Sequence, residues 1–355
     1  MNDAKEKTVY ILLGNGASIQ TIKDLKMEDR VDLRNLFSQC DRVPWPQNHH
    51  ECFLSQKHCQ ELWSMGVKAT NDAQGASNLI NNIITSMNVY NYCVSNSSRT
   101  LDSLRIDKLK ESFYYKAYCQ LVSYFLNLFI YYNNQVDDNM LLRYATELKC
   151  GNIYDFIDAK CKEGYRIRII SYNYDIFLER ILKLKKSLFK VAGFDEISES
   201  DKIVIYKPHG SISFISKEKR KSPHYSVIKD PFDSISHSIK NMEIDMSIKA
   251  DHSIINPIVP PAGDANRSGD GWLTDIGKSI KEVLSAATSE DALLIYGISY
   301  DHVDRLEIDK IISSLPYDMD VNYINPYPTE TFEIVLASVF ANYSHYKFFY
   351  KELYS

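Results

Sequence analysis

A series of short apolar runs, each ending at a polar or glycine-rich turn, constrains the fold of this chain more than any other feature. The strand-like runs cover residues 8–13, 166–170, 203–206, 254–259, 292–296 and 319–324. Helix-like segments separate several of the later runs, at 174–185, 272–287, 302–313 and 329–340. Strands that alternate with helices pair in parallel, and their apolar sequences indicate burial on both faces. We therefore predict an α/β fold with a parallel sheet.

A long segment of different pattern separates the first strand from the others. Helix-like periodicity covers 76–93, 105–133 and 139–162. The middle helix carries an apolar stripe at spacings of three and four, which is typical of a core-facing helix, formed by Leu121, Tyr124, Phe125, Leu128 and Phe129. We predict that residues 1–19 and 164–355 form one α/β domain and that 20–163 form a helical insertion after its first strand.

Composition and charge restrict the class of protein. Of the 355 residues, 45% are apolar, enough for a sizeable core, and the formal net charge is −5. The densest basic stretch, Lys217–Lys221, is interrupted by Glu218, so we expect no direct nucleic-acid binding. Seven irregularly spaced cysteines argue against a disulfide scaffold. The longest apolar stretch, Ala117–Tyr132, is too short and too polar for a membrane span, and Met1–Lys7 lacks a signal-peptide core. We expect a cytoplasmic protein without a membrane partner.

A glycine-containing turn follows the first predicted strand. Gly14 and Gly16 allow a close backbone approach, and the N–H groups of a following helix can hold a pyrophosphate. Ala17 continues the turn, and Ser18 adds a hydroxyl donor. Ile19 occupies the third glycine position of the full Gly-x-Gly-x-x-Gly motif. The turn therefore indicates either a phosphate site or a tight strand-to-helix connection without a ligand.

Two polar segments follow two other predicted strands. Ser171–Asp175 contains Asn173, and Lys207–Ser211 contains His209. Each has an alternative interpretation, because Asn173 or Asp175 would also cap a helix and His209 would also serve as a hydrogen-bonded structural residue. The carboxyl ends of parallel strands meet at one edge of a sheet, so we expect these segments to lie beside the glycine turn. Together they indicate a site that holds a dinucleotide and acts on its ribose.

The three segments together resemble the signatures of the sirtuin family: a Gly-Ala-Gly-x-Ser turn, an Asn-x-Asp segment and a His-Gly pair. Similarity continues in the stretches Pro257–Gly263, Asp291–Tyr300 and Tyr323–Pro326. The runs Ile255–Pro261 and Ile295–Tyr300, with Trp272 and Asp304, are similar to a prokaryotic sirtuin-like branch associated with NAD hydrolysis in anti-phage defence. The resemblance covers 8–18 and about 165–340.

The resemblance implies a sirtuin-like Rossmann sheet, a catalytic pair and an NAD site. The catalytic pair would be Asn173 and His209. The residues implied to hold phosphate are Gly14, Gly16, Ala17 and Ser18, and those implied to line the rest of the NAD site are Asp175, Gly297, Ser299 and Asn325. The implied reaction is hydrolysis of NAD, as substrate, to ADP-ribose and nicotinamide.

The chemistry agrees with these residue types. The nicotinamide leaving group is already a cationic pyridinium, so it needs no general acid, unlike the leaving groups of ordinary glycosidases. An Asn173 amide can orient water or a ribose hydroxyl, and His209 can act as a base near neutral pH. Two alternatives stay open: an NAD-dependent protein deacylase, and a sensor that binds NAD or another nucleotide without turnover.

Sirtuin deacylases typically carry a zinc module with paired Cys-x-x-Cys, and this sequence has no such pair. A group of cysteines and histidines near residue 52 fits no common zinc spacing, and it comprises Cys40, His49, His50, Cys52, His58 and Cys59. We therefore expect no metal, which favours water as the nucleophile.

The resemblance also implies a cellular role and partners. Sirtuin-like defence proteins act as effectors that deplete NAD in abortive infection, and similar subunits form oligomers. Many work with a second protein such as a translocase-type ATPase, an Argonaute or another sensor. We therefore expect a homo-oligomer whose NAD cleavage is gated by assembly or by a second defence-system protein.

Overall fold

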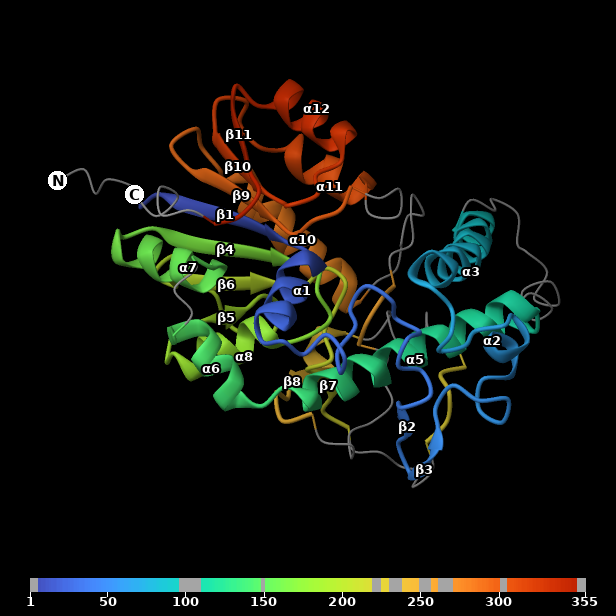
Figure 1. Ribbon diagram of the computed structural model, residues 1–355. Coiled ribbons are helices and arrows are strands. Elements are labelled where there is room, and N and C mark those ends of the chain that lie inside the picture. Colours follow the sequence, from blue (N-terminus) through green and yellow to red (C-terminus); the bar gives the residue numbers. More distant parts are fainter. Residues whose placement is uncertain are drawn as a thin grey trace.

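The computed structural model is an α/β, Rossmann-like fold, as predicted (Figure 1). It describes residues 6–95, 110–147, 151–218, 225–229, 238–248, 257–260, 271–300 and 305–349. Seven parallel strands form the main sheet in the spatial order β11-β10-β9-β1-β4-β6-β5. Their bounds are β1 Thr8–Leu13, β4 Arg166–Ser171, β5 Lys190–Val191, β6 Ile203–Tyr206, β9 Ala292–Tyr296, β10 Asp320–Ile324 and β11 Asn342–Tyr346.

The central strand β1 is buried on both faces because every one of its six residues is buried. Alternate side chains of a strand point to opposite faces. Val9 and Ile11 accordingly pack into one hydrophobic cluster, and Tyr10 and Leu12 pack into a second. A strand of this composition is stable only when both faces are covered, so helices must lie on both sides of the sheet.

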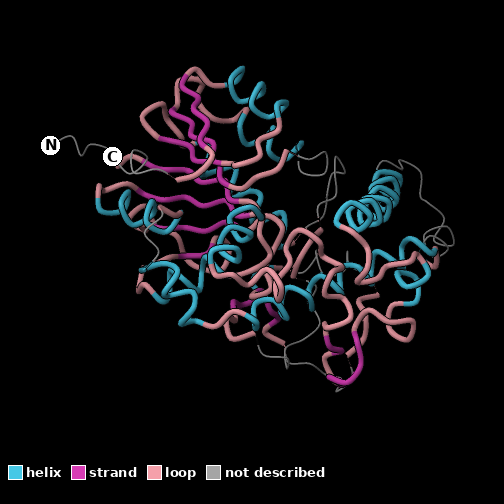
Figure 2. The backbone as a smooth tube through the Cα atoms, in the orientation of Figure 1, coloured by secondary structure: helices cyan, strands magenta, loops and turns pink. Residues whose placement is uncertain are grey.

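Helices cover both faces of the sheet (Figures 1 and 2). The first cluster receives side chains from α1 (Asn15–Asp24), α7 (Ile153–Lys162) and α8 (Phe177–Leu184). The second cluster receives them from three helices of the C-terminal part, namely α10 (Trp272–Ser285), α11 (Arg305–Ile312) and α12 (Glu330–Val339). The remaining helix beside this sheet is α6 (Asp138–Glu147), which packs against α8.

The elements between α1 and α6 lie beyond the carboxyl ends of the sheet strands (Figure 1). They are β2 (Pro44–Trp45), β3 (Asn48–Cys52), α2 (Gln60–Ser64), α3 (Ala73–Ser95) and α5 (Phe113–Gln135). The predicted apolar stripe of α5 is buried, and it joins the same hydrophobic cluster as one face of β1. Because one cluster runs through both regions, the division into 1–19 with 164–355 and 20–163 stays a prediction.

The chain changes direction across β1. From β1 it runs to β4 and β6 on one side, and later it returns to β9 on the other side, so that Leu13 is in register with both Ser171 and Tyr296. Open parallel sheets bind ligands at the carboxyl ends of the strands where the strand order reverses. The ends of β1, β4 and β9 form such a point.

Most predicted elements are confirmed within a few residues, but three were wrong or incomplete, and the edge strands β5 and β11 were missed. The predicted helix at 105–133 begins only at Phe113, after its N-cap Ser112, and 105–109 lie outside the described residues. The predicted strand at 254–259 is not a strand in its described part, where Ile258 forms only an isolated bridge to Gly210, and 254–256 lie outside the described residues. The predicted helix at 139–162 is two helices, because Asn152 caps α7 through its side chain. Edge strand β11 was missed because its sequence, Asn342–Tyr346, is mostly polar.

The short antiparallel pairs were also missed. β2 pairs with β3, and β7 (Phe214–Ser216) pairs with β8 (Met242–Ile244), which follows the 3-10 helix η1 (Ile239–Asn241). None of the helices in the described part of the chain has the length and apolarity that a membrane crossing requires. Among the described residues no cysteine forms a disulfide, and Cys40, Cys52, Cys59, Cys119 and Cys161 are thiols.

Glycines allow the turns after β1 and β9 to touch. Gly14 N donates to Tyr296 O at 2.9 Å, and Gly16 N donates to Gly297 O at 2.8 Å. A Cβ on Gly14 would lie 2.5 Å from Gly297 O, and one on Gly16 would lie 2.6 Å from Gly297 Cα. Gly297 itself has a φ of 65°, in the left-handed region that favours glycine. This contact therefore needs glycine at all three positions.

We expect Gly16→Ala to lower the free energy of unfolding by roughly 1–3 kcal/mol, because the added methyl group meets backbone that cannot move aside. Gly277→Ala is the matched control: Gly277 lies inside α10 with open space around the added Cβ. Alanine is the better helix former, so this control should raise the free energy of unfolding by about 0.5–1 kcal/mol. Urea denaturation of both variants measures the difference, and equal stability of the two would contradict the proposed contact.

Candidate functional site

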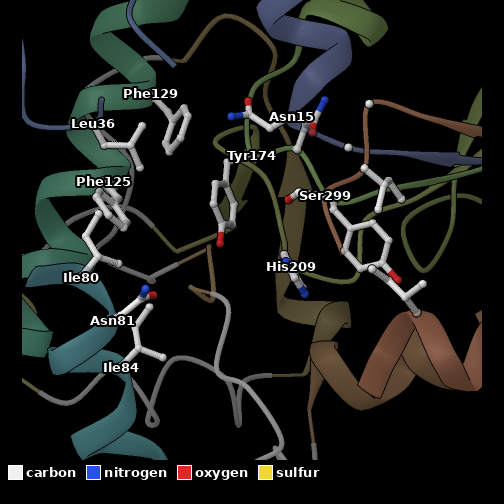
Figure 3. Close-up of a pocket in the computed structure, with 16 residues that line it drawn as sticks. Asn15, Leu36, Ile80, Asn81, Ile84, Phe125, Phe129, Tyr174, His209 and Ser299 are labelled. Atoms are coloured by element: carbon white, nitrogen blue, oxygen red, sulfur yellow. The ribbon is translucent and has the colours of Figure 1, made fainter. Parts of the chain in front are cut away.

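Two adjoining cavities lie at the carboxyl ends of β1, β4 and β9. The first, the His209 cavity, has a volume of about 210 Å³ (Figure 3). The second, the Asn325 cavity, has a volume of about 830 Å³, which falls in the usual range for small-molecule sites. Asn15, Gly297 and Ser299 line both cavities. The cavities therefore meet at the glycine contact between the ends of β1 and β9.

A buried hydrogen-bond chain links the glycine turn to the segment after β4. Asn173 Nδ2 donates to Ser18 Oγ at 3.0 Å, and Ser18 Oγ donates to Asp175 Oδ2 at 2.8 Å. All three side chains are buried. Since the carboxylate only accepts, the Ser18 hydroxyl proton points to Asp175 and its lone pair faces the Asn173 amide nitrogen. The chain therefore sets which end of the Asn173 amide faces Ser18.

The other end of that amide has no hydrogen-bond partner among the described residues. Asn173 lines the His209 cavity, and its Oδ1 is buried. A buried acceptor that lacks a hydrogen bond costs about 1–3 kcal/mol, so each such atom calls for an explanation, and a ligand in the cavity supplies one here. The amide oxygen can accept a hydrogen bond from a hydroxyl group or a water molecule in the cavity.

Asp175 is the acceptor at the end of this hydrogen-bond chain. Burial raises the pKa of its carboxyl group, and the nearby Lys207 ammonium opposes that rise. Lys207, which is almost completely buried, donates from Nζ to Asp175 O and to Glu179 Oε1, each at 2.7 Å. The N-cap position of α8 is occupied by Ile176, but Asp175 Oδ1 accepts from Phe177 N, the first residue of the helix. Asp175 therefore does contribute a hydrogen bond to the helix start, as the capping alternative predicted. These contacts hold the Asn173–Asp175 segment rigidly.

His209 is in direct contact with α11. Its Nε2 is 2.8 Å from Glu307 Oε2, and the side chain is 2% exposed. The imidazole packs edge-to-face on the Tyr172 ring, with centroids 5.0 Å apart, and lies 6.4 Å from the Tyr174 ring. The His209 backbone oxygen accepts from Val259 N. The ring is therefore held in one place while it still lines the cavity.

The opposite wall of the His209 cavity is mostly apolar, with Asn81 as a polar member, and comes from the region between α1 and α6. Figure 3 shows Ile80 and Ile84 of α3, with Phe125 and Phe129 of α5, facing His209 and Ser299 across the cavity. Leu36 extends the same wall. Side chains of the predicted α5 stripe thus serve both in the core and at the cavity. This wall keeps bulk water away from the polar side.

The lining of the Asn325 cavity is more highly charged than that of the His209 cavity. Three cationic side chains line it, Lys23, Arg34 and Lys347, against one acidic side chain, Asp24. Its aromatic lining includes two exposed rings, those of Tyr327 and Phe348. A cationic cavity with exposed aromatic rings suits a ligand that has phosphate groups and a flat heterocycle.

The ten predicted site residues fall into three groups, and Gly297 and Ser299 belong to both of the first two. Those lining the His209 cavity are Gly14, Asn173, His209, Gly297 and Ser299. Those lining the Asn325 cavity are Gly16, Asn325, Gly297 and Ser299. Those lining neither of these cavities are Ala17, Ser18 and Asp175.

The groups predicted to hold phosphate have hydrogen-bond partners within the protein. The N–H groups of Gly14, Gly16 and Ala17 donate to protein carbonyls, and Ser18 Oγ is committed to Asn173 and Asp175. In this structure the glycine turn serves chiefly for close packing. Asn325 Nδ2 likewise donates to Ile298 O and to the Tyr323 hydroxyl, which connects the loops after β9 and β10.

The cysteine and histidine group near residue 52 has structural contacts. His58 stacks on Trp45 with centroids 3.8 Å apart, and its Nε2 is 2.6 Å from Glu51 Oε2. Cys59 Sγ donates to Phe53 O. Within the described ranges, no group of three or more potential metal-ligating side chains was found.

Sequence reasoning missed Glu307, the aromatic rings around His209 and the buried Lys207. Lys207 could have been identified from the sequence, since it lies two residues before His209. Nothing in the sequence connects Glu307 with a histidine 98 positions away. No protein-family model matches the sequence, and no curated protein matches it at a significant level. The site is therefore interpreted from its own geometry.

We expect Ser18→Ala to lower the free energy of unfolding by about 1–3 kcal/mol, because both Asn173 Nδ2 and the Asp175 carboxylate lose a buried partner. Ser279→Ala is the control, since its part-buried hydroxyl only donates to Asp275 O within α10. That control should change stability by less than about 0.5 kcal/mol. Chemical denaturation measures both, and a similar loss in the two variants would contradict a special role for Ser18.

Proposed function

We propose that this protein hydrolyses NAD at the bond between ribose and nicotinamide, releasing ADP-ribose and nicotinamide. The observation that carries the proposal is the buried Oδ1 of Asn173, which has no hydrogen-bond partner among the described residues. The residue Asn173 lines the same cavity as His209. An acceptor and a base at one cavity suit a reaction that adds water to a ribose carbon. The location at the reversal point of a parallel sheet supports a nucleotide ligand.

The proposed reaction assigns a role to each side chain. The C1′–N bond breaks with both electrons leaving on the pyridinium nitrogen, so that nicotinamide departs neutral. Asn173 Oδ1 accepts a hydrogen bond from the water or a ribose hydroxyl, and His209 takes the proton released as the water oxygen bonds to C1′. The apolar wall of α3 and α5 limits the number of water molecules that reach the oxocarbenium-like centre. No Lewis acid is needed, because the leaving group is already cationic.

The two cavities suit the two halves of NAD. We assign the nicotinamide ribose to the His209 cavity and the adenosine half to the Asn325 cavity. The pyrophosphate would then cross between Asn15, Gly297 and Ser299, which line both cavities. The cationic side chains and exposed rings of the Asn325 cavity support this direction of binding.

The proposal includes a sirtuin-like form of the Rossmann sheet with residues 20–163 as an insertion. A deacylase is the second candidate, because the apolar wall formed by Ile80, Ile84, Phe125 and Phe129 would also contact an acyl-lysine chain. The two activities differ in their requirements. Deacylation releases nicotinamide only when an acyl peptide is present, whereas hydrolysis needs water alone. A sensor would bind NAD without releasing nicotinamide.

We expect Asn173→Ala and His209→Ala each to lower the rate of NAD cleavage by about 100-fold or more, because each removes a group that acts on the reacting ribose or water. Chromatography of nicotinamide and ADP-ribose measures the rate. Asn48→Ala and His50→Ala are matched controls, since both side chains are exposed on β3 and line neither cavity. Parental rates in both site variants would show that the site is assigned wrongly.

We also propose that the protein is a cytoplasmic, NAD-depleting effector of anti-phage defence, gated by self-assembly or by a second protein. Two helices that reach the outer surface, α3 and α5, also form the wall of the His209 cavity. A partner that moves these helices would change access to Asn173 and His209. This geometry supports coupling between assembly and cleavage.

We therefore expect a homo-oligomer that cleaves NAD slowly alone and faster with its activating partner. Light scattering measures the assembly, and nicotinamide release with and without the neighbouring operon product measures the coupling. Cells that express the protein alone should keep their NAD. A monomer that cleaves NAD at full rate without a partner would contradict the gated model.

A further inference from the structure

The Nε2 atom of His209 faces a carboxylate that does not itself line the cavity. Glu307 Oε2 lies 2.8 Å from His209 Nε2. The histidine side chain is 2% exposed and the glutamate side chain is 35% exposed, so the pair runs from the buried site toward the surface. Glu307 is absent from the residues that line the His209 cavity, whereas its neighbour Ile308 is among them. The carboxylate therefore stands behind the imidazole.

The helix that carries Glu307 is firmly anchored. Ile308, Ile311 and Ile312 of α11 are buried in the second hydrophobic cluster. Tyr300 donates its hydroxyl hydrogen to Asp309 of the same helix, and the Arg305 guanidinium lies 4.8 Å from the Tyr300 ring centroid. A carboxylate on an anchored helix can set the position of a side chain that it contacts.

We propose that Glu307 is a positioning residue that holds the His209 ring in one orientation and in the Nε2–H tautomer. An ionised carboxylate only accepts hydrogen bonds, so Nε2 carries the proton that faces Glu307. The carboxylate thereby fixes the orientation of the imidazole that takes the proton in the proposed reaction, as in other sites where a third group orients a base. The kinetic part of this inference rests on the proposed function.

Other histidine–glutamate pairs supply an internal comparison. In the part of the chain that the structure describes, Glu51 pairs with His58 and Glu333 pairs with His345. Glu51 is 31% exposed, close to the value for Glu307, and its distance to the histidine Nε2 is 2.6 Å. Neither His58 nor His345 lines the His209 cavity. Glu51→Ala is therefore a matched control for the loss of a glutamate paired with a histidine.

The kinetic test is a double-mutant cycle on the full chain, with NAD as the probe. We expect Glu307→Ala to lower kcat about 100-fold while KM changes by less than about 3-fold, because a base is impaired and substrate contacts are kept. Glu307→Gln, which keeps an acceptor but not the charge, should recover part of the rate. In the His209→Ala background the Glu307→Ala change should alter kcat by less than about 2-fold, since Glu307 acts through His209. Glu51→Ala should leave both constants unchanged.

A second measurement does not depend on turnover. Nitrogen-15 NMR of the histidine rings reports the tautomer of each. His209 should be in the Nε2–H tautomer in the parent protein and should lose that preference in Glu307→Ala but not in Glu51→Ala. If the parent releases no nicotinamide, the proposed function fails while the NMR result still decides the role of Glu307. An Nδ1–H tautomer in the parent, or an undiminished Glu307→Ala effect without His209, would overturn the inference.

Discussion

The backbone contact between the turns after β1 and β9 is the constraint on which the rest of the site depends. Gly14, Gly16 and Gly297 approach more closely than any side chain would allow. This contact sets the start of α1 and therefore the position of Ser18, 4% exposed, over the segment after β4. Without it, Asn173 would lose the hydroxyl that orients its amide.

Buried polar groups then determine the chemistry that the site can perform. Lys207 donates to Glu179 Oε1 and to the Asp175 backbone oxygen, whereas the Asp175 carboxylate accepts from Ser18 Oγ and Phe177 N. The desolvation of these buried groups is therefore offset by hydrogen bonds and by opposite charge. The Asn173 amide oxygen differs from these groups, since it is buried without a hydrogen-bond partner among the described residues. Because Asn173 lines the His209 cavity, this acceptor is suited to bind a hydroxyl or water there.

The candidate site was only partly accessible from the sequence. Polar residues directly after apolar strands could be identified, because parallel strands present their carboxyl ends at one edge, and Asn173 and His209 do line one cavity. Ser18 and Asp175 were singled out as ligand contacts, yet they lie behind the cavity and orient Asn173. Glu307 could not be identified, because its contact with His209 depends on how α11 packs and not on any local pattern.

The sequence by itself determined the elements whose signal is local. The β-branched runs specified β1, β4, β6, β9 and β10, and the periodic apolar stripe specified α5, since buried strands and helices repeat at intervals of two and 3.6 residues. Only the tertiary structure decided which side chains share a cavity. The apolar wall from α3 and α5, the commitment of the turn N–H groups to protein carbonyls and the pairing of His209 with Glu307 all join residues distant in the chain. Such contacts follow from packing of the whole hydrophobic core, which no short segment encodes.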